Sequence, residues 1–560
     1  MALKDKIRNL KECLDNRSIY DGYYNDAVCD DIVYLESRNG KDFTGNIFRI
    51  TQELSTGEYG DFRIYVYASK EVKSKIDLFG KNYNLNITEI ITDDKKATEI
   101  LHKAKYIFTD SGIRNKYIKK QGQIFINTWH GTPLKLMGFD NPAERTSIGI
   151  IQRSFFFSDY LLYPNDYMME KMTHAYMIDK IFRGKMLLEG YPRNSVFLDK
   201  TNIKDRLGLG DKTVYAYLPT YKGILSKRKD EKQKEDVEKF LDKINSRFSD
   251  HQILFVKFHP YNQSKIDFSR YGHIKAFPDG FENYDILNIA DVLVTDYSSV
   301  FFDFANSGKK IVIFNYDEEE YLKDRGLYIP LESLPFPKVQ NTDELIDELN
   351  GLKNYDDEKF VKEFCRYDSK DSVKRICSSV IGGDIVCKYG QIENPNKNIL
   401  FYVGSMDNSE VKNKLIQMLE EMENVNVFLS YKQWDKNINE NYMTLFDDIP
   451  KNVEFLPLSH NIAPTFKEKI DLIKFIKGTE LNENLIKLFN RSYKRQYGNF
   501  KFDLVIDFAS NDLESLIFAH SGLDNAIVTD ESTQSKISSQ FNKIYSISDI
   551  DLEKIIGEDR

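Results

Sequence analysis

Residues 123–135 read Gln-Ile-Phe-Ile-Asn-Thr-Trp-His-Gly-Thr-Pro-Leu-Lys, an apolar run of strand length that breaks into a Gly/Pro turn carrying His130. In open α/β sheets, ligands bind beyond the carboxyl ends of the strands, so a titratable ring at such an end can reach a substrate. A lone histidine there is most often an ordinary turn residue. With Trp129 and Gly131 beside it, we favour a catalytic general base.

Apolar runs of strand length alternate with amphipathic helical segments along most of the chain. This alternation predicts parallel, doubly wound α/β sheets. The expected strands fall in three blocks: 31–35, 63–68, 87–91, 106–109 and 124–129; 214–217, 253–258, 292–295 and 311–315; 398–404, 425–430 and 504–508. We therefore expect a helical lead over 1–33, Rossmann-like domains over 34–195 and 196–392 with a cleft between them, and a further Rossmann-like α/β domain over 393–560.

Two segments have ambiguous patterns. Residues 147–184 are helical and aromatic in pattern, including the run 160–163. A core or interdomain helix is the more common explanation, and a helix on a lipid surface is the alternative. The run 491–497 mixes basic and aromatic residues, which on an acidic chain is typical of a solvated helix face.

The composition is that of an acidic globular protein. Hydrophobic residues make up 41% of the 560 residues, an ordinary value for a globular protein. The formal net charge of −9 disfavours a general role in binding nucleic acid or anionic lipid and leaves room for local basic patches. Five scattered cysteines without a Cys-x-x-Cys pair predict neither a disulfide framework nor a zinc site, and they fit a reducing cytosol. No apolar run approaches the roughly 20 residues that span a bilayer, and no signal peptide is visible, so any membrane contact should be local.

Two further strand ends carry polar groups. Lys257 and His259 are two residues apart on a predicted strand, so both side chains share a face and could point at one anionic group, although Pro260 equally suits an ordinary exit turn. Ser298 and Ser299 precede an apolar helical run. Serine there is usually only a cap, and the alternative is a phosphate that faces the free amides of the helix.

Cations at other turns have two similar interpretations. Lys222 follows Thr220 after a predicted strand, and Arg193 lies in a turn with Tyr191 and Pro192. Each is either a solvated surface charge or a group that neutralises a leaving nucleotide. The sequence has no Walker A loop, no Gly-x-Gly-x-x-Gly and no His-Glu-x-x-His motif, so we expect neither an obligatory metal nor a cofactor.

Six separated motifs follow one another along the chain: Glu36-Ser37 with Gly40, Thr128 to Lys135, Gly190 to Arg193, Pro219-Thr220, Lys257 to Pro260, and Thr295 to Ser299 with Phe302-Asp303. In this order they resemble the CDP-glycerol glycerophosphotransferase family, which includes teichoic acid primases and polymerases. The resemblance covers about residues 34–341. It implies a GT-B-type pair of Rossmann-like domains, with the CDP-alditol against the second domain and the acceptor entering from the first.

The resemblance and the strand-end residues together imply a site. His130 and His259 would be catalytic. The substrate would be bound by Thr128, Gly131, Lys135, Arg193, Thr220, Lys222, Lys257, Thr295, Asp296, Ser298, Ser299 and Asp303. Relatives often have an arginine where this chain has Lys222, and lysine keeps the charge but loses the bidentate fork.

The expected reaction is transfer of glycerol phosphate, or a related alditol phosphate, from CDP-glycerol or CDP-ribitol to a lipid-linked teichoic acid or capsule acceptor, with release of CMP. Such an enzyme would be cytoplasmic and peripheral on the cytoplasmic face of the cell membrane, and self-association into a homo-oligomer is left open. The alternatives are a GT-B glycosyltransferase that uses a nucleotide sugar and a catalytically idle scaffold for envelope assembly. The third domain, which looks like half of a GT-B glycosyltransferase, would bind the acceptor or serve in assembly.

Overall fold

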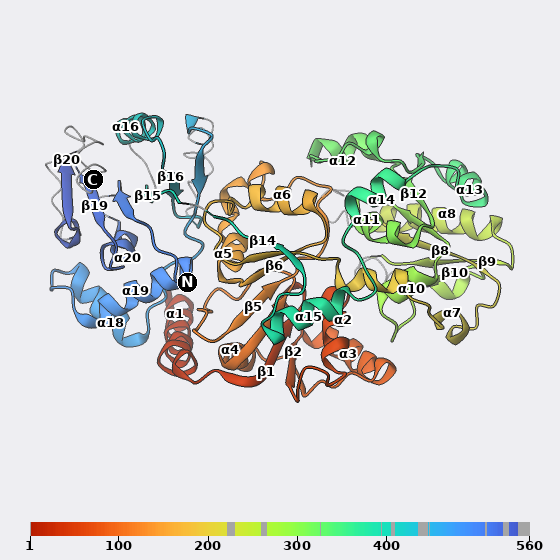
Figure 1. Cartoon of the computed structure of the whole chain (residues 1–560), viewed down its shortest axis with the longest axis horizontal. Helices are drawn as coiled ribbons and strands as arrows, with labels where there is room; N and C mark the ends of the chain where they lie inside the picture. The colour runs from red at the N-terminus through yellow and green to blue at the C-terminus, as the bar shows by residue number, and fades with distance from the viewer. Residues whose placement is uncertain are drawn as a thin grey trace.

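The chain folds into three bodies. Each body is built on one β-sheet whose strands are mainly parallel. The computed structural model describes residues 2–220, 230–258, 266–324, 326–393, 395–404, 409–434, 446, 448–509, 512–529 and 537–546. Figure 1 shows the three bodies in a row, with the body of the first sheet in the middle. We call the bodies of the first and second sheets the first and second lobes, and the body of the third sheet the third domain. The predicted α/β class with a GT-B-type pair of lobes and an additional α/β domain is confirmed.

The first lobe is built on a sheet of order β14-β7-β6-β5-β4-β1-β2-β3. All neighbours are parallel except β14, which is antiparallel to β7. The strands are β1 (Cys29–Glu36), β2 (Arg63–Tyr67), β3 (Glu89–Ile91), β4 (Ala104–Thr109), β5 (Ile124–Asn127), β6 (Tyr160–Tyr163), β7 (Lys185–Leu188) and β14 (Lys388–Gly390). The helices are α1 (Ala2–Arg17), α2 (Asn46–Leu54), α3 (Lys70–Tyr83), α4 (Asp94–Lys103), α5 (Gly149–Phe157) and α6 (Asp166–Ala175).

The second lobe has a parallel sheet of order β10-β9-β8-β11-β12-β13. Its strands are β8 (Thr213–Leu218), β9 (Gln252–Val256), β10 (Ile274–Ala276), β11 (Val292–Thr295), β12 (Lys310–Phe314) and β13 (Lys338–Val339). Its helices are α7 (Ile203–Arg206), α8 (Asp230–Arg247), α10 (Asn283–Ile289), α11 (Val300–Phe304), α12 (Glu318–Asp324) and α13 (Thr342–Asn350).

The chain then returns to the first lobe before it enters the third domain. Helix α14 (Glu358–Phe364) packs on α6, α15 (Ser372–Gly382) packs on α2, and β14 joins the first sheet. This crossing follows the second sheet in sequence and lies over the first lobe in Figure 1. It ties the two lobes together with a second connection.

The third domain is a parallel sheet of order β17-β16-β15-β18-β19-β20. Its strands are β15 (Asn398–Tyr402), β16 (Asn426–Ser430), β17 (Val453–Phe455), β18 (Leu504–Asp507), β19 (Asn525–Thr529) and β20 (Lys543–Ser546), and its helices are α16 (Ser409–Glu420), α18 (Phe466–Ile476), α19 (Glu483–Tyr497) and α20 (Leu516–Ala519). In each of the three sheets, the first six strands in sequence take the order 3-2-1-4-5-6, which is that of dinucleotide-binding folds. Each sheet therefore has a topological switch point between its first and fourth strands, the position at which folds of this class commonly bind ligands.

The first lobe and the third domain share a hydrophobic core. The aromatic rings of Phe139 and Phe455 stack with centroids 5.0 Å apart, and the amide of Gln152 donates to the Phe455 carbonyl at 2.8 Å. The guanidinium of Arg153, which is buried in this contact, donates to the carbonyls of Tyr117 and Arg495. The third domain is thus packed onto the first lobe through a shared core.

Polar groups make many of the contacts between the two lobes. Arg49 of α2 pairs with Asp285 of α10 at 2.6 Å, and Asp285 also accepts from the Tyr83 hydroxyl at 2.6 Å. The Gly45 amide donates to the Glu282 carboxylate at 2.9 Å. Because these groups come from opposite lobes, ion pairs and hydrogen bonds hold the lobes beside each other.

Two expectations about the ambiguous segments need correction. Residues 160–163 form strand β6 and not part of a helical region, because a short apolar run that is buried on both faces carries no distinctive periodicity. In the run 491–497, Arg495 and Tyr497 are buried against the first lobe and within the third domain, so this face of α19 is not solvated. The segment 147–184 does contain an interdomain helix, since Phe155 and Phe157 of α5 are buried. Among the described residues, no helix combines the length and the apolar character needed to cross a membrane.

Candidate functional site

The switch points of the first and second sheets lie at the contact between the lobes. In the first sheet, Ser37 follows β1, Asp110 follows β4, and His130 lies in the turn after β5. In the second sheet, β8 and β11 are the neighbours at which the strand order reverses. Ligands of open α/β sheets bind beyond such strand ends, so the junction is the candidate site.

Asp110 organises the strand ends of the first lobe. Its carboxylate accepts hydrogen bonds from the Ser37 hydroxyl at 2.6 Å and from the Arg38 amide at 2.8 Å. Burial raises the pKa of this carboxyl group. The Asp110 backbone carbonyl lies 2.6 Å from Nδ1 of His130. Since a carbonyl oxygen only accepts, Nδ1 of His130 carries a proton.

His130 is a neutral imidazole with one free lone pair. Burial, together with the charges of Arg38 and Arg193, lowers the pKa of His130 to about 3. With the proton on Nδ1, the lone pair is on Nε2, which makes no hydrogen bond to any residue within the described ranges. The imidazole stacks on the Trp129 ring with centroids 4.3 Å apart. This protonation state is the one that a general base requires.

The turn before His130 is held by its neighbours in a backbone conformation that few residues other than glycine adopt. Trp129 has φ 51°. Its amide donates to Oδ1 of Asn127 at 2.9 Å, and its carbonyl accepts from Nδ2 of Asn46 at 3.3 Å. The indole ring is buried and contacts Phe155 edge-on. These contacts fix the direction in which the His130 ring leaves the strand end.

Arg193 links the His130 turn to the second lobe. It lies in the 3-10 helix Pro192–Leu198, and its Nη1 donates to the His130 carbonyl at 3.0 Å. Its Nη2 pairs with Asp303 of α11 at 2.7 Å, and the same carboxylate oxygen accepts from the Tyr284 hydroxyl at 2.8 Å. Burial alone would lower the pKa of Arg193, but Asp303 and the neighbouring tyrosines raise it. Arg193 is therefore a fixed positive charge at the junction.

Gly131 of the first lobe and Ser299 of the second lobe lie close together at the site. A Cβ atom on Gly131 would lie 2.7 Å from Oγ of Ser299, which is closer than real Cβ atoms come. Ser299 is the N-cap residue of α11, but its hydroxyl makes no capping hydrogen bond. A side chain at position 131 would therefore have to displace the Ser299 hydroxyl, which faces the residue that follows His130.

The strand ends of the second lobe are joined by Asp296. This buried carboxylate accepts from the Thr220 amide at 2.8 and 2.9 Å and from the Thr220 hydroxyl at 2.6 Å. The Thr295 hydroxyl donates to the Leu218 carbonyl at 2.7 Å. The ends of β8 and β11 are thus fixed side by side, with Ser298 partly exposed just beyond them.

The other predicted site residues are more dispersed. The Thr128 hydroxyl is buried and donates to the Trp129 carbonyl at 2.9 Å. The Lys135 ammonium lies over the Tyr321 ring, 5.3 Å from its centroid. Lys257 is partly buried, and burial and the charge of Lys75 lower its pKa. Because Lys75 belongs to the first lobe, Lys257 lies on the side of the second lobe that faces the first.

His259 and Lys222 lie outside the described residues. The predicted site residues that the structure brings together are His130, Gly131, Arg193, Ser299 and Asp303. Within the described ranges, no group of three or more His, Cys, Asp or Glu side chains is placed to hold a metal ion.

Several residues of the site were missed by sequence reasoning. Asp110 directly follows the apolar run of β4, so the polar strand-end signal that identified His130 could also have found it. Three others contribute through hydrogen bonds with residues distant in sequence, and no local sequence pattern predicts such bonds: Asn46, Glu282 and Tyr284.

The chain is similar to known proteins of one family. Residues 22–382 match the family CDP-Glycerol:Poly(glycerophosphate) glycerophosphotransferase. A teichoic acid poly(glycerol phosphate) polymerase of Bacillus spizizenii is 29% identical over 377 residues, which are 63% of this chain and 92% of that protein. The teichoic acid ribitol-phosphate polymerase TarK of Staphylococcus aureus is 26% identical over 348 residues, which are 57% of this chain and 65% of that protein.

Solved structures of one related polymerase share the fold. The wall teichoic acid polymerase TagF matches with a TM-score of 0.56 and 25% sequence identity, over 68% of this chain and 97% of that chain. A histidine variant of TagF soaked with CDPG matches with the same TM-score. The family match ends before the third domain begins.

Proposed function

This chain belongs to the CDP-glycerol:poly(glycerophosphate) glycerophosphotransferase family, and on this premise we propose that it transfers glycerol phosphate, or a related alditol phosphate, from a CDP-alditol to a lipid-linked polyol-phosphate or glycan acceptor. CMP is the leaving group. The single observation that carries the proposal is the position of His130. Its Nδ1 lies 2.6 Å from the Asp110 carbonyl, and the next residue, Gly131, lies against Ser299 of the second lobe.

In the proposed reaction, an acceptor hydroxyl attacks the phosphorus that bears the alditol. The new oxygen–phosphorus bond forms as the bond from this phosphorus to the CMP oxygen breaks, and the hydroxyl proton passes to Nε2 of His130. A pKa of about 3 describes the protein without substrate. The charge of a bound diphosphate favours the imidazolium form, so donor binding itself would strengthen this base.

The second lobe would hold the donor. Ser298 and Ser299 lie at the start of α11, beyond the ends of β8 and β11, where their hydroxyls can donate to phosphate oxygens. Arg193 supports this assignment as a positive charge beside the site, although its described contacts are to protein groups. We retain Lys257 for the donor and His259 and Lys222 for the diphosphate as parts of the proposal.

The enzyme would work peripherally on the cytoplasmic face of the membrane, where a lipid-linked acceptor is presented. The names of relatives include both glycerol-phosphate and ribitol-phosphate polymerases. The donor therefore has to be identified by experiment.

The test is a donor panel. CDP-glycerol, CDP-ribitol, UDP-glucose and GDP-mannose are each incubated with a short synthetic lipid-linked acceptor, the nucleotide product is measured, and the product length is read by mass spectrometry. We expect CMP release from one CDP-alditol and growth of the acceptor by alditol-phosphate units. Turnover of a UDP- or GDP-sugar alone would identify a glycosyltransferase, and no turnover and no thermal shift with any donor would identify an idle scaffold.

A further inference from the structure

Helix α18 of the third domain exposes an apolar stripe. Phe466, Ile470, Ile473 and Ile476 have exposed fractions of 48%, 41%, 47% and 67%. Their spacing of four, three and three residues places them on one side of the helix. A surface helix of a globular protein normally turns such a stripe toward the core.

The opposite side of α18 is already packed. Phe475 and Glu468 are buried, and the Glu468 carboxylate forms two hydrogen bonds with Arg491 of α19, at 2.8 and 2.7 Å. A capping box between Thr465 and Glu468 fixes the start of the helix. The stripe is therefore not the side of α18 that packs on the core of the third domain, because Phe475 and Glu468 are buried there on the opposite side.

Lysines accompany the stripe. Lys467, Lys474 and Lys477 are exposed, and Lys469 is partly exposed. Of the two acids on the helix, Glu468 is bonded to Arg491 and Asp471 accepts from Asn484 at 2.8 Å. The chain as a whole has a net charge of −9, so this basic surface is a local exception.

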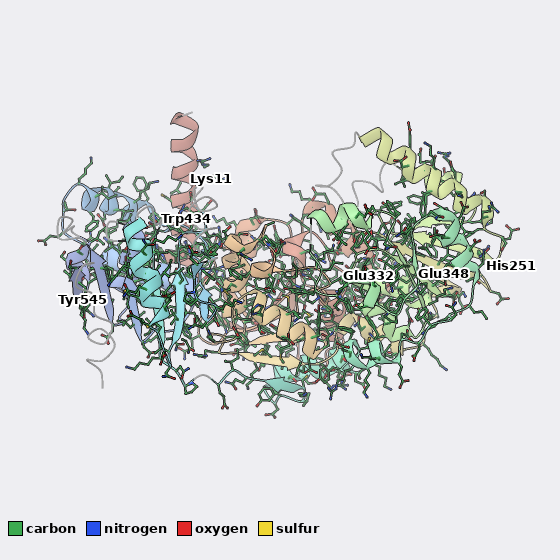
Figure 2. The ribbon with its side chains drawn as sticks, turned by 90° about the horizontal axis from the view of Figure 1, so that it is seen from above. Lys11, His251, Glu332, Glu348, Trp434 and Tyr545 are labelled. Atoms are coloured by element: carbon green, nitrogen blue, oxygen red, sulfur yellow. The ribbon has the colours of Figure 1, made fainter. Side chains whose placement is uncertain are left out.

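Helix α1 extends the same region of the surface. It packs beside α18, and the amide of Asn16 donates to the Pro464 carbonyl at 2.9 Å. Leu14 is 49% exposed and Lys11 is exposed. Figure 2 shows α1 projecting from the body, with Lys11 labelled.

We infer that the α18 stripe, consisting of Phe466, Ile470, Ile473 and Ile476 with the lysines beside them, docks the third domain on an anionic lipid bilayer. An apolar side flanked by lysines suits a helix that lies in the plane of the interface, since the side chains enter the acyl boundary while the ammonium groups reach anionic headgroups. A second copy of the chain fits less well, because a symmetric contact would bring the lysines of both copies together. The inference deepens the proposed use of a lipid-linked acceptor by naming the surface that meets the membrane.

The test is co-flotation of the full chain with vesicles. Phosphatidylcholine vesicles with and without phosphatidylglycerol are compared for the wild type, for Ile470→Glu/Ile473→Glu, and for Lys467→Glu/Lys474→Glu/Lys477→Glu. We expect the wild type to float with the anionic vesicles and each variant to lose about tenfold or more in lipid affinity. Added salt should weaken wild-type binding, because headgroup attraction is screened.

Leu352→Glu is the matched control, since Leu352 is an exposed leucine of the second lobe with an exposed fraction of 88%. It should float like the wild type, and circular dichroism should show that all variants are folded. Equal flotation of the isoleucine variant and the wild type would overturn the inference. So would a change from oligomer to monomer in that variant, measured by light scattering, because the stripe would then be a contact between copies. CMP release from a water-soluble acceptor is measured in parallel, so failure of lipid docking and failure of the proposed chemistry give different results.

Discussion

The first lobe has two interfaces of opposite character. Toward the third domain it presents aromatic rings, with Phe139 stacked on Phe455 in a core that both bodies share. Toward the second lobe it presents charges and hydrogen bonds, with Arg49 on Asp285 and Arg193 on Asp303. The apolar interface joins two bodies in one core, whereas the polar interface leaves hydrogen-bonding groups at strand ends where a charged substrate can bind.

The strand ends at the switch points of the first and third sheets also differ in what lies opposite them. The third sheet has the switch-point topology of the other two, but Lys432 there is paired with Asp512 at 2.6 Å and with Glu514 at 3.4 Å. No residue of either lobe is described in contact with these three groups. In the first lobe, Gly131 of the turn after β5 meets Ser299 of the opposite lobe. A shared topology therefore becomes a candidate active site only where a facing lobe supplies complementary groups.

Removal of the proposed base, His130, should have the largest effect. His130→Ala should lower kcat for CMP release by about 10²- to 10⁴-fold, the usual range for general acid–base catalysis. Its melting temperature should stay close to that of the wild type. The control is His251→Ala, since His251 is exposed at the far end of the second lobe (Figure 2). If His130→Ala releases CMP at the wild-type rate, His130 is not the base.

The buried ion pair of the polar interface comes next. Arg193→Ala leaves Asp303 charged and buried without its partner, which should cost about 3–5 kcal/mol in the free energy of unfolding. Arg193→Ala/Asp303→Ala should recover part of this stability but not the activity. Arg270→Ala is the control, because its ion pairs are exposed and should contribute less than about 1 kcal/mol. Urea unfolding measures all three, and equal losses for Arg193→Ala and Arg270→Ala would contradict the burial argument.

A truncation at the apolar interface with the third domain should affect stability but not turnover. Phe455→Ala removes a buried ring from the shared core and should lower the free energy of unfolding by about 3 kcal/mol. Because Phe455 contacts none of the described residues of the candidate site, kcat/KM of the folded variant should stay within about twofold of wild type. A loss of turnover as large as that of His130→Ala would show that the two interfaces are not functionally separate.

The smallest expected effect concerns the contact between Gly131 and Ser299. Gly131→Ala should overlap the Ser299 hydroxyl and weaken donor binding by about 1–3 kcal/mol. Ser299→Ala should relieve part of this loss, so a double-mutant cycle on the Kd for CDP-glycerol should give a coupling energy on the order of 1 kcal/mol. Gly272→Ala is the control, since nothing lies within 4 Å of a Cβ built there. Strict additivity would mean that the lobes do not meet at this contact.

Much of the fold was predictable because apolar strands of standard length end in polar turns. That pattern identified β1, β4, β5, β8 and β11 and, through them, His130 and Ser299. It could not identify β6, whose four residues are largely buried and have no alternation. The burial of Arg495 was also hidden, since its guanidinium donates to the carbonyl of Asn461, 34 residues away in sequence.

Individual residues of the candidate site could be predicted from the sequence, but the contacts between them could not. Sequence reasoning selected His130, Arg193 and Asp303 separately, whereas their hydrogen bonds join segments more than 60 residues apart. The role of Asp110 depends on its backbone carbonyl, and every residue except proline offers the same pair of backbone groups. Non-local contacts of this kind leave no periodicity for a sequence to reveal.

In the proposed reaction a neutral His130 accepts a proton beside a bound CDP-alditol. Nitrogen NMR of the labelled histidines with and without CDP-glycerol tests this directly. The chain has 8 histidines, and His130→Gln assigns the signal. We predict that free His130 carries its proton on Nδ1 and does not titrate between about pH 5 and 8, because burial lowers its pKa to about 3. CDP-glycerol should raise this pKa, since its negative charge favours the imidazolium. A His130 that titrates near the ordinary value of about 6.5 and does not respond to CDP-glycerol would contradict the account.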